Sequence, residues 1–324
     1  MTVPERLESG PRITRRGLLG TAAASAAALP LLSTRTLRAA EGTAVDGTAV
    51  INGRIKQSIV FWCFNVAGEK WDIERTCQKA QELGCKSVEL VPPEHWDTLK
   101  KYGLVCAIAP NGMQGAPFMR GFNNPKYHDE VIARTTKAID QCADAGFPSV
   151  IAFTGFKWRD ADNPKSGEIS RDEGAENCVK GLKQVIGHAE KRGVNICLEH
   201  LNTRDDTHPM KGHPGYMGDD VDWVAEMLRR VGSPRMKLLF DCYHVQIMNG
   251  DLIRRIGQLK DVIGHVHTAG NPGRNELDEN QEIQYSPVMR KLLDIGYDGY
   301  VGQEFIPTRD PSAGLRQAIA ACDV

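Results

Sequence analysis

Four short apolar runs in the second half of the chain each end in a residue that can bind a metal. These residues are Glu199, Asp241, His267 and Glu304. If the runs are neighbouring strands of one parallel barrel, their last residues meet at the same rim. Three carboxylates and one imidazole brought together would repel one another unless a cation lay between them. The ligand set suits a hard or borderline ion, so we expect these side chains to bind one Mn²⁺, Mg²⁺ or Co²⁺.

Three polar residues close to these strand ends are candidates for contacts with a substrate. His244 follows Asp241 by three positions, and Asp205 follows Glu199 within a polar loop. Arg274 lies in a loop that is rich in glycine and proline. A guanidinium group above a metal can bind an anionic or polar group of a ligand. We therefore expect Arg274 and His244 to bind substrate, whereas Asp205 either does the same or caps its loop.

Other polar and aromatic residues lie inside or near the apolar runs. Glu89 is an acidic residue within an apolar strand, so we expect it to pair with a group inside the barrel. His265 precedes His267 by two positions, which places it on the same strand face but one layer deeper. Aromatic residues near the ends of the first two strands are candidates for a pocket wall or for core packing: Trp62, Phe64 and Trp96.

The elements that would position these residues alternate between short apolar runs and amphipathic stretches. Eight runs are typical of buried parallel strands: 57–63, 86–91, 104–109, 148–154, 194–199, 236–241, 262–267 and 299–304. Helical periodicity is found over 69–83, 125–145, 173–192, 221–231 and 286–293. Eight strands alternating with helices in about 250 residues predict a single-domain α/β fold, the (β/α)8 TIM barrel. A doubly wound sheet is the alternative, but no glycine-rich nucleotide-binding motif follows the first strand.

The first forty residues differ in composition from the rest of the chain. Arg15 and Arg16 precede an uncharged stretch of mostly Ala and Leu over 17–34, which resembles a twin-arginine export signal. The alternatives are an Ala-rich helix, a disordered tail or a retained membrane anchor. We expect residues 1–40 to be the signal peptide, 41–55 a linker and 56–324 the barrel. The mature protein would then be exported to the periplasm or cell envelope.

The overall composition excludes several classes of protein. The formal net charge of −1 excludes a polycationic nucleic-acid binder. No apolar run of about 20 residues follows position 40, so we expect no stable membrane span in the mature form. The nine cysteines are odd in number and form no C-x-x-C motif. This pattern is typical of core thiols rather than of a disulfide framework.

Four segments carry a resemblance to a known family: Glu199-x-x-Asn202-Thr203-Arg204-Asp205, Asp241-x-Tyr243-His244-x-Gln246, Asn271–Glu276 and Ile295–Glu304. Over residues 57–310 the chain resembles the xylose isomerase-like barrel superfamily and, within it, most closely the hydroxypyruvate isomerase family. The resemblance implies a metal bound at Glu199, Asp241, His267 and Glu304, and substrate contacts at His244, Arg274 and Asp205. Hydroxypyruvate isomerases are expected to carry glutamine where this chain has His267, whereas related ketose 3-epimerases use histidine there.

The same resemblance implies a metal-dependent sugar or keto-acid isomerase, acting for example on hydroxypyruvate to give tartronate semialdehyde. The metal would polarise the carbonyl group, and Glu199 or Glu304 would remove a carbon-bound proton to give a cis-enediolate. The alternatives are a ketose 3-epimerase, an inosose-type dehydratase, a non-catalytic exported sugar-binding protein and a phosphodiesterase of the endonuclease IV type. The expected partner is a small sugar or hydroxy-keto acid and not a nucleic acid; a homo-oligomer is left open.

Overall fold

The computed structural model describes residues 47–66 and 68–324. Within them, seven parallel strands form one sheet in the order β2-β1-β9-β8-β7-β6-β3. The strands are β1 (Lys56–Val60), β2 (Ser87–Glu89), β3 (Ser149–Phe153), β6 (Asn195–Glu199), β7 (Met236–Asp241), β8 (Ile263–Thr268) and β9 (Tyr300–Gln303). Each of them falls within or beside a run that the sequence predicts to be a strand.

The segment 104–109 closes this sheet into a barrel. Val105 forms a parallel bridge to Ser87 at one edge of the sheet, and Ala109 forms another to Val150 at the other edge. The N–H groups of Leu90 and Ile151 donate to carbonyl groups of this segment at 2.9 and 3.0 Å. The strand predicted over 104–109 is therefore present as an irregular segment that hydrogen-bonds to both of its neighbours. The predicted TIM barrel is confirmed.

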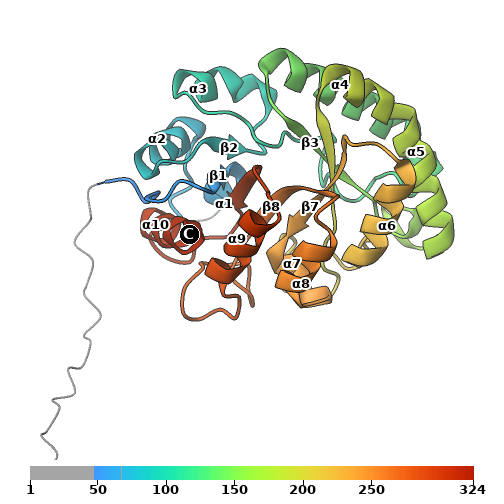
Figure 1. The fold of residues 1–324 in the computed structure, drawn as a ribbon. Helices are drawn as coiled ribbons and strands as arrows, with labels where there is room; N and C mark the ends of the chain where they lie inside the picture. The colour runs from blue at the N-terminus through green and yellow to red at the C-terminus, as the bar shows by residue number, and fades with distance from the viewer. Residues whose placement is uncertain (1–46, 67) are drawn as a thin grey trace, which may run out of the picture. The chain divides into compact units, whose positions relative to one another are not determined.

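Helices surround the sheet on its outer face (Figure 1). They are α1 (Phe61–Val66), α2 (Ile73–Leu83), α3 (Trp96–Lys101), α4 (His128–Ala145), α5 (Arg171–Arg192), α6 (Val221–Val231), α7 (Cys242–Met248), α8 (Leu252–Gln258), α9 (Tyr285–Asp294) and α10 (Pro311–Cys322). Glycines in the left-handed conformation end α2, α4, α5 and α6, because glycine alone adopts that conformation without strain. Most of the core lies between these helices and the sheet.

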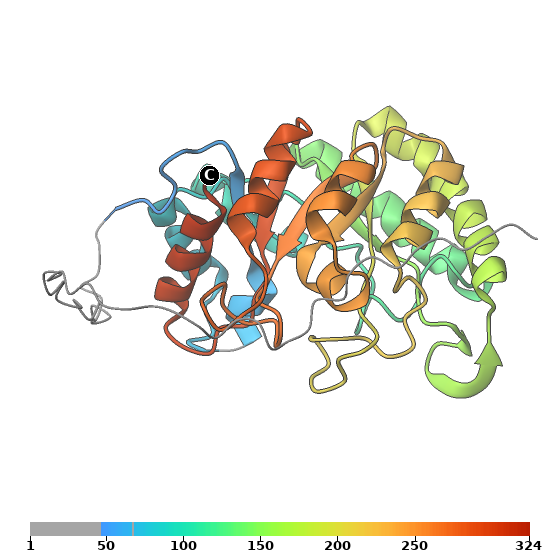
Figure 2. The ribbon, with the colours of Figure 1, turned by 60° about the horizontal axis from the view of Figure 1, so that its bottom comes forward.

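The structure differs from the sequence prediction at the first strand. We expected a strand over 57–63, but β1 ends at Val60 and α1 begins at Phe61. The run from Val60 to Phe64 is apolar throughout, and such a run does not distinguish a strand from a buried helix. A two-stranded hairpin, β4 (Trp158–Asp160) with β5 (Asn163–Glu168), was not expected either. Figure 2 shows this hairpin and the loop after β6 extending beyond the same end of the barrel.

The segment that precedes β1 lies against the end of α10. The N–H groups of Ile51, Asn52 and Gly53 donate to the carboxylate of Asp323 at 2.5, 2.6 and 2.9 Å. Residues 47–55, which we expected to belong to a linker, are thus held on the barrel. The predicted signal peptide, residues 1–40, lies outside the described residues. Among the described helices, none is both long and apolar enough to cross a membrane.

Candidate metal centre and substrate pocket

The strand register brings the four predicted metal ligands together at the carboxyl ends of β6, β7, β8 and β9. Asp241 pairs with His267, and His267 pairs with Gly302, two residues before Glu304. Glu199 ends β6 one strand further along. All four side chains are buried, and one ligand atom of each lies within 4.8 Å of the others. The sequence predicted this set because each of the four residues ends one of four consecutive strands, and the carboxyl ends of barrel strands meet at one rim.

The two carboxylate oxygens of Asp241 make different contacts, one with the start of helix α7 and one with the ligand cluster. Its Oδ1 accepts hydrogen bonds from the N–H groups of Tyr243, at 2.8 Å, and His244, at 3.4 Å, and so caps helix α7. Its Oδ2 faces the other ligands, 3.3 Å from Nη2 of Arg274. The cap fixes the orientation of the carboxylate, so Oδ2 points into the cluster.

The electrostatics of the cluster fit a cation. Burial raises the pKa of Glu199 well above its usual value, and the charge of Glu304 adds to the shift. Burial also raises the pKa of Asp241 to about 6, against the effect of Arg274. Oε1 of Glu199 is buried and makes no hydrogen bond, and Nδ1 of His267 faces Oε2 of Glu304 at 2.7 Å. Buried carboxylates and an unpaired carboxylate oxygen at one point are the surroundings that a divalent ion would stabilise.

Arg274 lies against the same cluster. Its Nη2 is 2.6 Å from Oε2 of Glu304, and its Nη1 donates to the carbonyl of Met210 at 2.5 Å. The guanidinium group packs between the rings of Trp62 and Tyr243, at 5.3 and 5.6 Å from their centroids. Arg274 is 2% exposed, so it is a fixed positive charge at the inner end of the site.

Both oxygens of Glu304 are engaged. Nε1 of Trp62 donates to Oε1 at 3.0 Å, while Arg274 and Nδ1 of His267 lie 2.6 and 2.7 Å from Oε2. Burial alone would raise the pKa of Glu304, but the charges of Arg274 and His267 lower it well below its usual value. Glu304 is therefore held ionised, whereas Glu199 keeps a carboxylate oxygen free.

Glu89 contacts both histidines of β8, His265 and His267. Its Oε1 lies 2.9 Å from Nε2 of His265 and 2.8 Å from Nε2 of His267. Gly302 permits this approach, because a Cβ at that position would lie 2.1 Å from the same oxygen. With Nε2 of His267 bound to Glu89, its Nδ1 is directed at the other predicted metal ligands. The sequence singled out Glu89 and the deeper position of His265, but not their contact.

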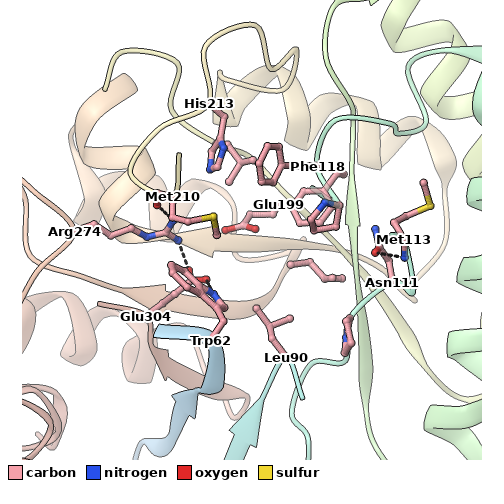
Figure 3. A pocket seen from close by; sticks show the side chains of 15 residues that line it. Trp62, Leu90, Asn111, Met113, Phe118, Glu199, Met210, His213, Arg274 and Glu304 are labelled. Carbon is pink, nitrogen blue, oxygen red and sulfur yellow. Dashed lines mark hydrogen bonds and ion pairs between the residues drawn. The ribbon is translucent and has the colours of Figure 1, made fainter. Parts of the chain in front are cut away.

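A pocket of about 260 Å³ opens beside the cluster (Figure 3). Glu199, Glu304 and Arg274 lie at one side of it, and the side chains of Leu90, Met113 and Phe118 lie around the rest, as Figure 3 shows. The structure thus places three of the predicted site residues on the pocket wall. Asp241 and His267 do not line the pocket, although their ligand atoms lie within 4.8 Å of those of Glu199 and Glu304.

The other two predicted substrate contacts do not line this pocket. Nδ1 of His244 accepts from the N–H of Asn202 at 3.1 Å, and its Nε2 is 3.5 Å from Asp241. Asp205 accepts hydrogen bonds from Thr207 and, at 3.2 Å, from the hydroxyl of Tyr243. His244 therefore lies beside Asp241, one of the predicted metal ligands, while the carboxylate of Asp205 is used within its own loop and by Tyr243.

The three aromatic candidates separate into one pocket residue and two core residues. Trp62 lines the pocket and hydrogen-bonds to Glu304. Phe64 stacks on Trp71 with 5.4 Å between ring centroids, and Trp96 packs edge-on against Phe147 at 4.9 Å. Sequence reasoning did not single out Phe118, which lies in the long loop 110–124, since nothing in that loop indicates which residue turns inward.

The raised pKa values of Asp241 and Glu199 make metal binding depend on pH. A carboxylate must lose its proton before it can bind a cation. Below pH 6 the dissociation constant for Mn²⁺ should therefore rise about tenfold per pH unit for each proton displaced, since the pKa of Asp241 is about 6. Titration calorimetry in buffers of different ionisation enthalpy measures both the affinity and the protons released. A constant affinity between pH 5 and 7 would contradict this reading of the cluster.

Comparison with known proteins identifies the family. A sequence model described as xylose isomerase-like TIM barrel matches residues 77–323. The chain belongs to the xylose isomerase-like TIM barrel family. A family member from Xenopus laevis, named "Putative hydroxypyruvate isomerase", is 40% identical over 252 residues, which are 75% of this chain and 88% of that protein.

Further relatives of the family are more distant or match over a shorter length. A 2-oxo-tetronate isomerase from Cupriavidus necator is 31% identical over 51% of this chain, and the match spans 62% of that relative's length. The crystal structure of an AP endonuclease of family 2 from Brucella melitensis superimposes with a TM-score of 0.64 and 22% identity. It covers 81% of this chain and 96% of that one, and this likeness concerns the fold.

Proposed function

We propose that this protein is a metal-dependent isomerase of α-hydroxy carbonyl compounds, of the hydroxypyruvate and 2-oxotetronate type. The observation that carries the proposal is the buried cluster of Glu199, Asp241, His267 and Glu304 beside a pocket that Arg274 also lines. The names of the relatives in Xenopus laevis and Cupriavidus necator support the substrate class.

The four side chains would bind one Mn²⁺, Mg²⁺ or Co²⁺. When bound, such an ion holds two adjacent oxygens of a substrate and polarises the carbonyl group. The donor set of three carboxylates and one imidazole fits these ions, and it contains none of the thiolates that favour structural zinc. Glu89 would keep His267 in the tautomer whose Nδ1 is free to bind.

Glu199 is the better placed of the two glutamates to act as general base. Its Oε1 makes no hydrogen bond, and its carboxylate lines the pocket. It would take the proton from the carbinol carbon, leaving a cis-enediolate of the substrate, and return a proton to the neighbouring carbon. Glu304, whose oxygens are held by Trp62 and Arg274, would stay ionised and keep its place beside the reacting carbons.

Arg274 would bind the carboxylate of a keto acid, because it is the positive charge on the pocket wall. Its replacement by methionine should raise KM for a keto acid at least about 100-fold, as expected for the loss of a buried charge-assisted pair. Arg274→Lys should recover only part of this, since lysine lacks the planar fork. Steady-state kinetics on an acid and on an uncharged ketose check this: an equal loss on both substrates would speak against carboxylate binding.

A substrate panel on the full chain tests the proposed function. The protein is stripped with EDTA, reloaded with Mn²⁺, Mg²⁺ or Co²⁺, and assayed with hydroxypyruvate, a 2-oxotetronate and a set of ketoses. We expect metal-dependent isomerisation of a keto acid, with no turnover after EDTA. Turnover that survives complete metal removal, or no turnover of any member by the loaded protein, would overturn the proposal.

A ketose 3-epimerase is the second candidate function, and His267 favours it. A histidine at this position is the feature by which the chain departs from the glutamine expected in hydroxypyruvate isomerases. The same base would serve, with the proton returned to the opposite face of the same carbon. Analysis of the products in D₂O separates the two: isomerisation moves the carbonyl group, whereas epimerisation leaves it in place and inverts one centre.

A further inference from the structure

The polarity of the pocket wall falls with distance from the cluster of proposed metal ligands. Its inner side holds the charged groups of Glu199, Glu304 and Arg274. The remaining wall is formed mainly by apolar side chains from four segments of the barrel: Leu90, Met113, Phe118, Ile151, Phe153 and Leu201. Figure 3 shows Phe118 and Met113 on the far side of Glu199 from Arg274, and Leu90 below Glu199. A ligand that reaches the cluster therefore extends its other end over apolar surface.

Two polar residues, Asn111 and His213, also line the pocket, and neither carries a charge near neutral pH. Oδ1 of Asn111 accepts from the N–H of Met113 at 3.1 Å, so this oxygen is used within the loop. The ring of His213 packs on Phe118 with 4.1 Å between centroids, and burial lowers the pKa of His213 to about 3. His213 is therefore uncharged near neutral pH. Among the described residues, the charged groups that line the pocket are all at its inner side.

This distribution favours one kind of substrate tail over another. Hydroxyl groups placed against the apolar wall would lose their hydrogen bonds to water without replacement, which disfavours binding. Alkyl or aryl groups would displace water from apolar surface, which favours binding. A three-carbon acid would fill only the inner side of a pocket of about 260 Å³. The polarity of the wall thus distinguishes among substrates that share the same reacting carbons.

We propose, resting on the isomerase function above, that the preferred substrates are 3-hydroxy-2-oxo acids with an alkyl or aryl group on C3. The carboxylate lies at Arg274, the reacting carbons at Glu199, and the C3 substituent against Phe118, Ile151 and Phe153. A proton leaves C3 for Glu199 and a proton returns to C2. The hydroxyl proton moves from the C3 oxygen to the C2 oxygen, so product and substrate have the same formula and no oxidant is needed.

A series of acids that differ only in the C3 substituent tests the proposal on the Mn²⁺-loaded full chain. The substituents are hydrogen, methyl, ethyl, phenyl and, as the matched polar member, hydroxymethyl. We expect kcat/KM to rise about fourfold for each methylene added from hydrogen to ethyl. The kcat/KM of the ethyl acid should exceed that of the hydroxymethyl acid at least about tenfold. A hydroxymethyl acid that equals or exceeds the ethyl acid would overturn the proposal.

Binding of stable analogues separates this proposal from the isomerase function. The 2-hydroxy acids with the same chain lengths have no keto group and therefore cannot isomerise. Their dissociation constants are measured by titration calorimetry. Tighter binding of alkyl than of hydroxyalkyl members, without turnover of any keto acid, would support the apolar subsite and overturn the isomerase function. Turnover of the keto acids with no alkyl preference in either assay would overturn the subsite and leave the isomerase function standing.

Substitution of the wall links the preference to named residues. Phe118→Ala should reduce the ethyl-to-hydrogen ratio of kcat/KM at least about fivefold, because it removes apolar surface that the tail contacts. Phe118→Tyr keeps the ring packing and should retain most of the ratio. Ile253→Ala, on the exposed side of α8, is the matched control. Unchanged Mn²⁺ affinity shows that the site is intact, and an unchanged ratio in Phe118→Ala would contradict the proposed position of the tail.

Discussion

Glu199→Gln should abolish turnover, with kcat at least about 10³-fold lower than in the native protein. General bases contribute factors of about 10² to 10⁴, and Glu199 would combine this proposed role with one of the four proposed metal positions. Its free Oε1 is the carboxylate oxygen of the cluster that is buried without a hydrogen bond on the pocket wall. Exchange of the substrate carbon-bound proton with D₂O should fall in parallel with turnover.

Glu304→Gln should be equally inactive for a different reason. Glutamine has one carbonyl oxygen for the two donors, Trp62 and Arg274, that the carboxylate now accepts from. It is also uncharged, so the site would lose both a charged proposed metal ligand and the counter-charge of the arginine. We therefore expect a larger loss of Mn²⁺ affinity for Glu304→Gln than for Glu199→Gln. Glu226→Gln, on the exposed side of α6, controls for the substitution itself. Turnover near that of the native protein in Glu199→Gln or Glu304→Gln would contradict the proposed roles of these two residues.

Removal of Glu89 should weaken metal binding although Glu89 is not one of the four proposed ligands. Its carboxylate holds Nε2 of both His265 and His267, at 2.9 and 2.8 Å. Loss of a group that orients a metal-binding histidine costs about 10- to 100-fold in metal affinity. Breaking a buried ion pair by removing one partner also destabilises a protein by about 3 to 5 kcal/mol. Glu89→Ala should show both losses, in Mn²⁺ titration and in urea unfolding.

Glu89→Gln distinguishes orientation from packing. Glutamine fills the same space and still offers one acceptor oxygen, so stability should largely return while Mn²⁺ affinity stays reduced.

The histidines lower the pKa of Glu89 to about 2 despite its burial. Its stabilisation is therefore complete above its ordinary pKa of 4.5 and is lost as the pH falls toward 2. Glu94→Ala, an exposed residue after β2, is the control, and equal acid sensitivity in Glu89→Gln would contradict the pairing.

The long helices were predictable because they carry a repeating local pattern. The helices α4 and α5 have 18 and 22 residues, enough turns for an apolar stripe to repeat. Helices α1, α3, α7 and α8 have only six or seven residues, fewer than two full turns. No periodicity can be read over such a length, so these helices emerge only when packing against the sheet decides their conformation.

The sequence by itself determined the barrel and the set of four candidate ligands, since alternating strands and helices place strand-end residues at one rim. The tertiary structure decided which groups hold those ligands in place and what surrounds them. Glu89 lies 178 residues from His267, and Trp62 lies 242 residues from Glu304. The tertiary structure also decided that Phe118 from a loop and Ile151 and Phe153 from β3 contribute to the apolar wall of the pocket. Contacts between distant segments follow from closure of the barrel, a property of the whole chain that no local pattern carries.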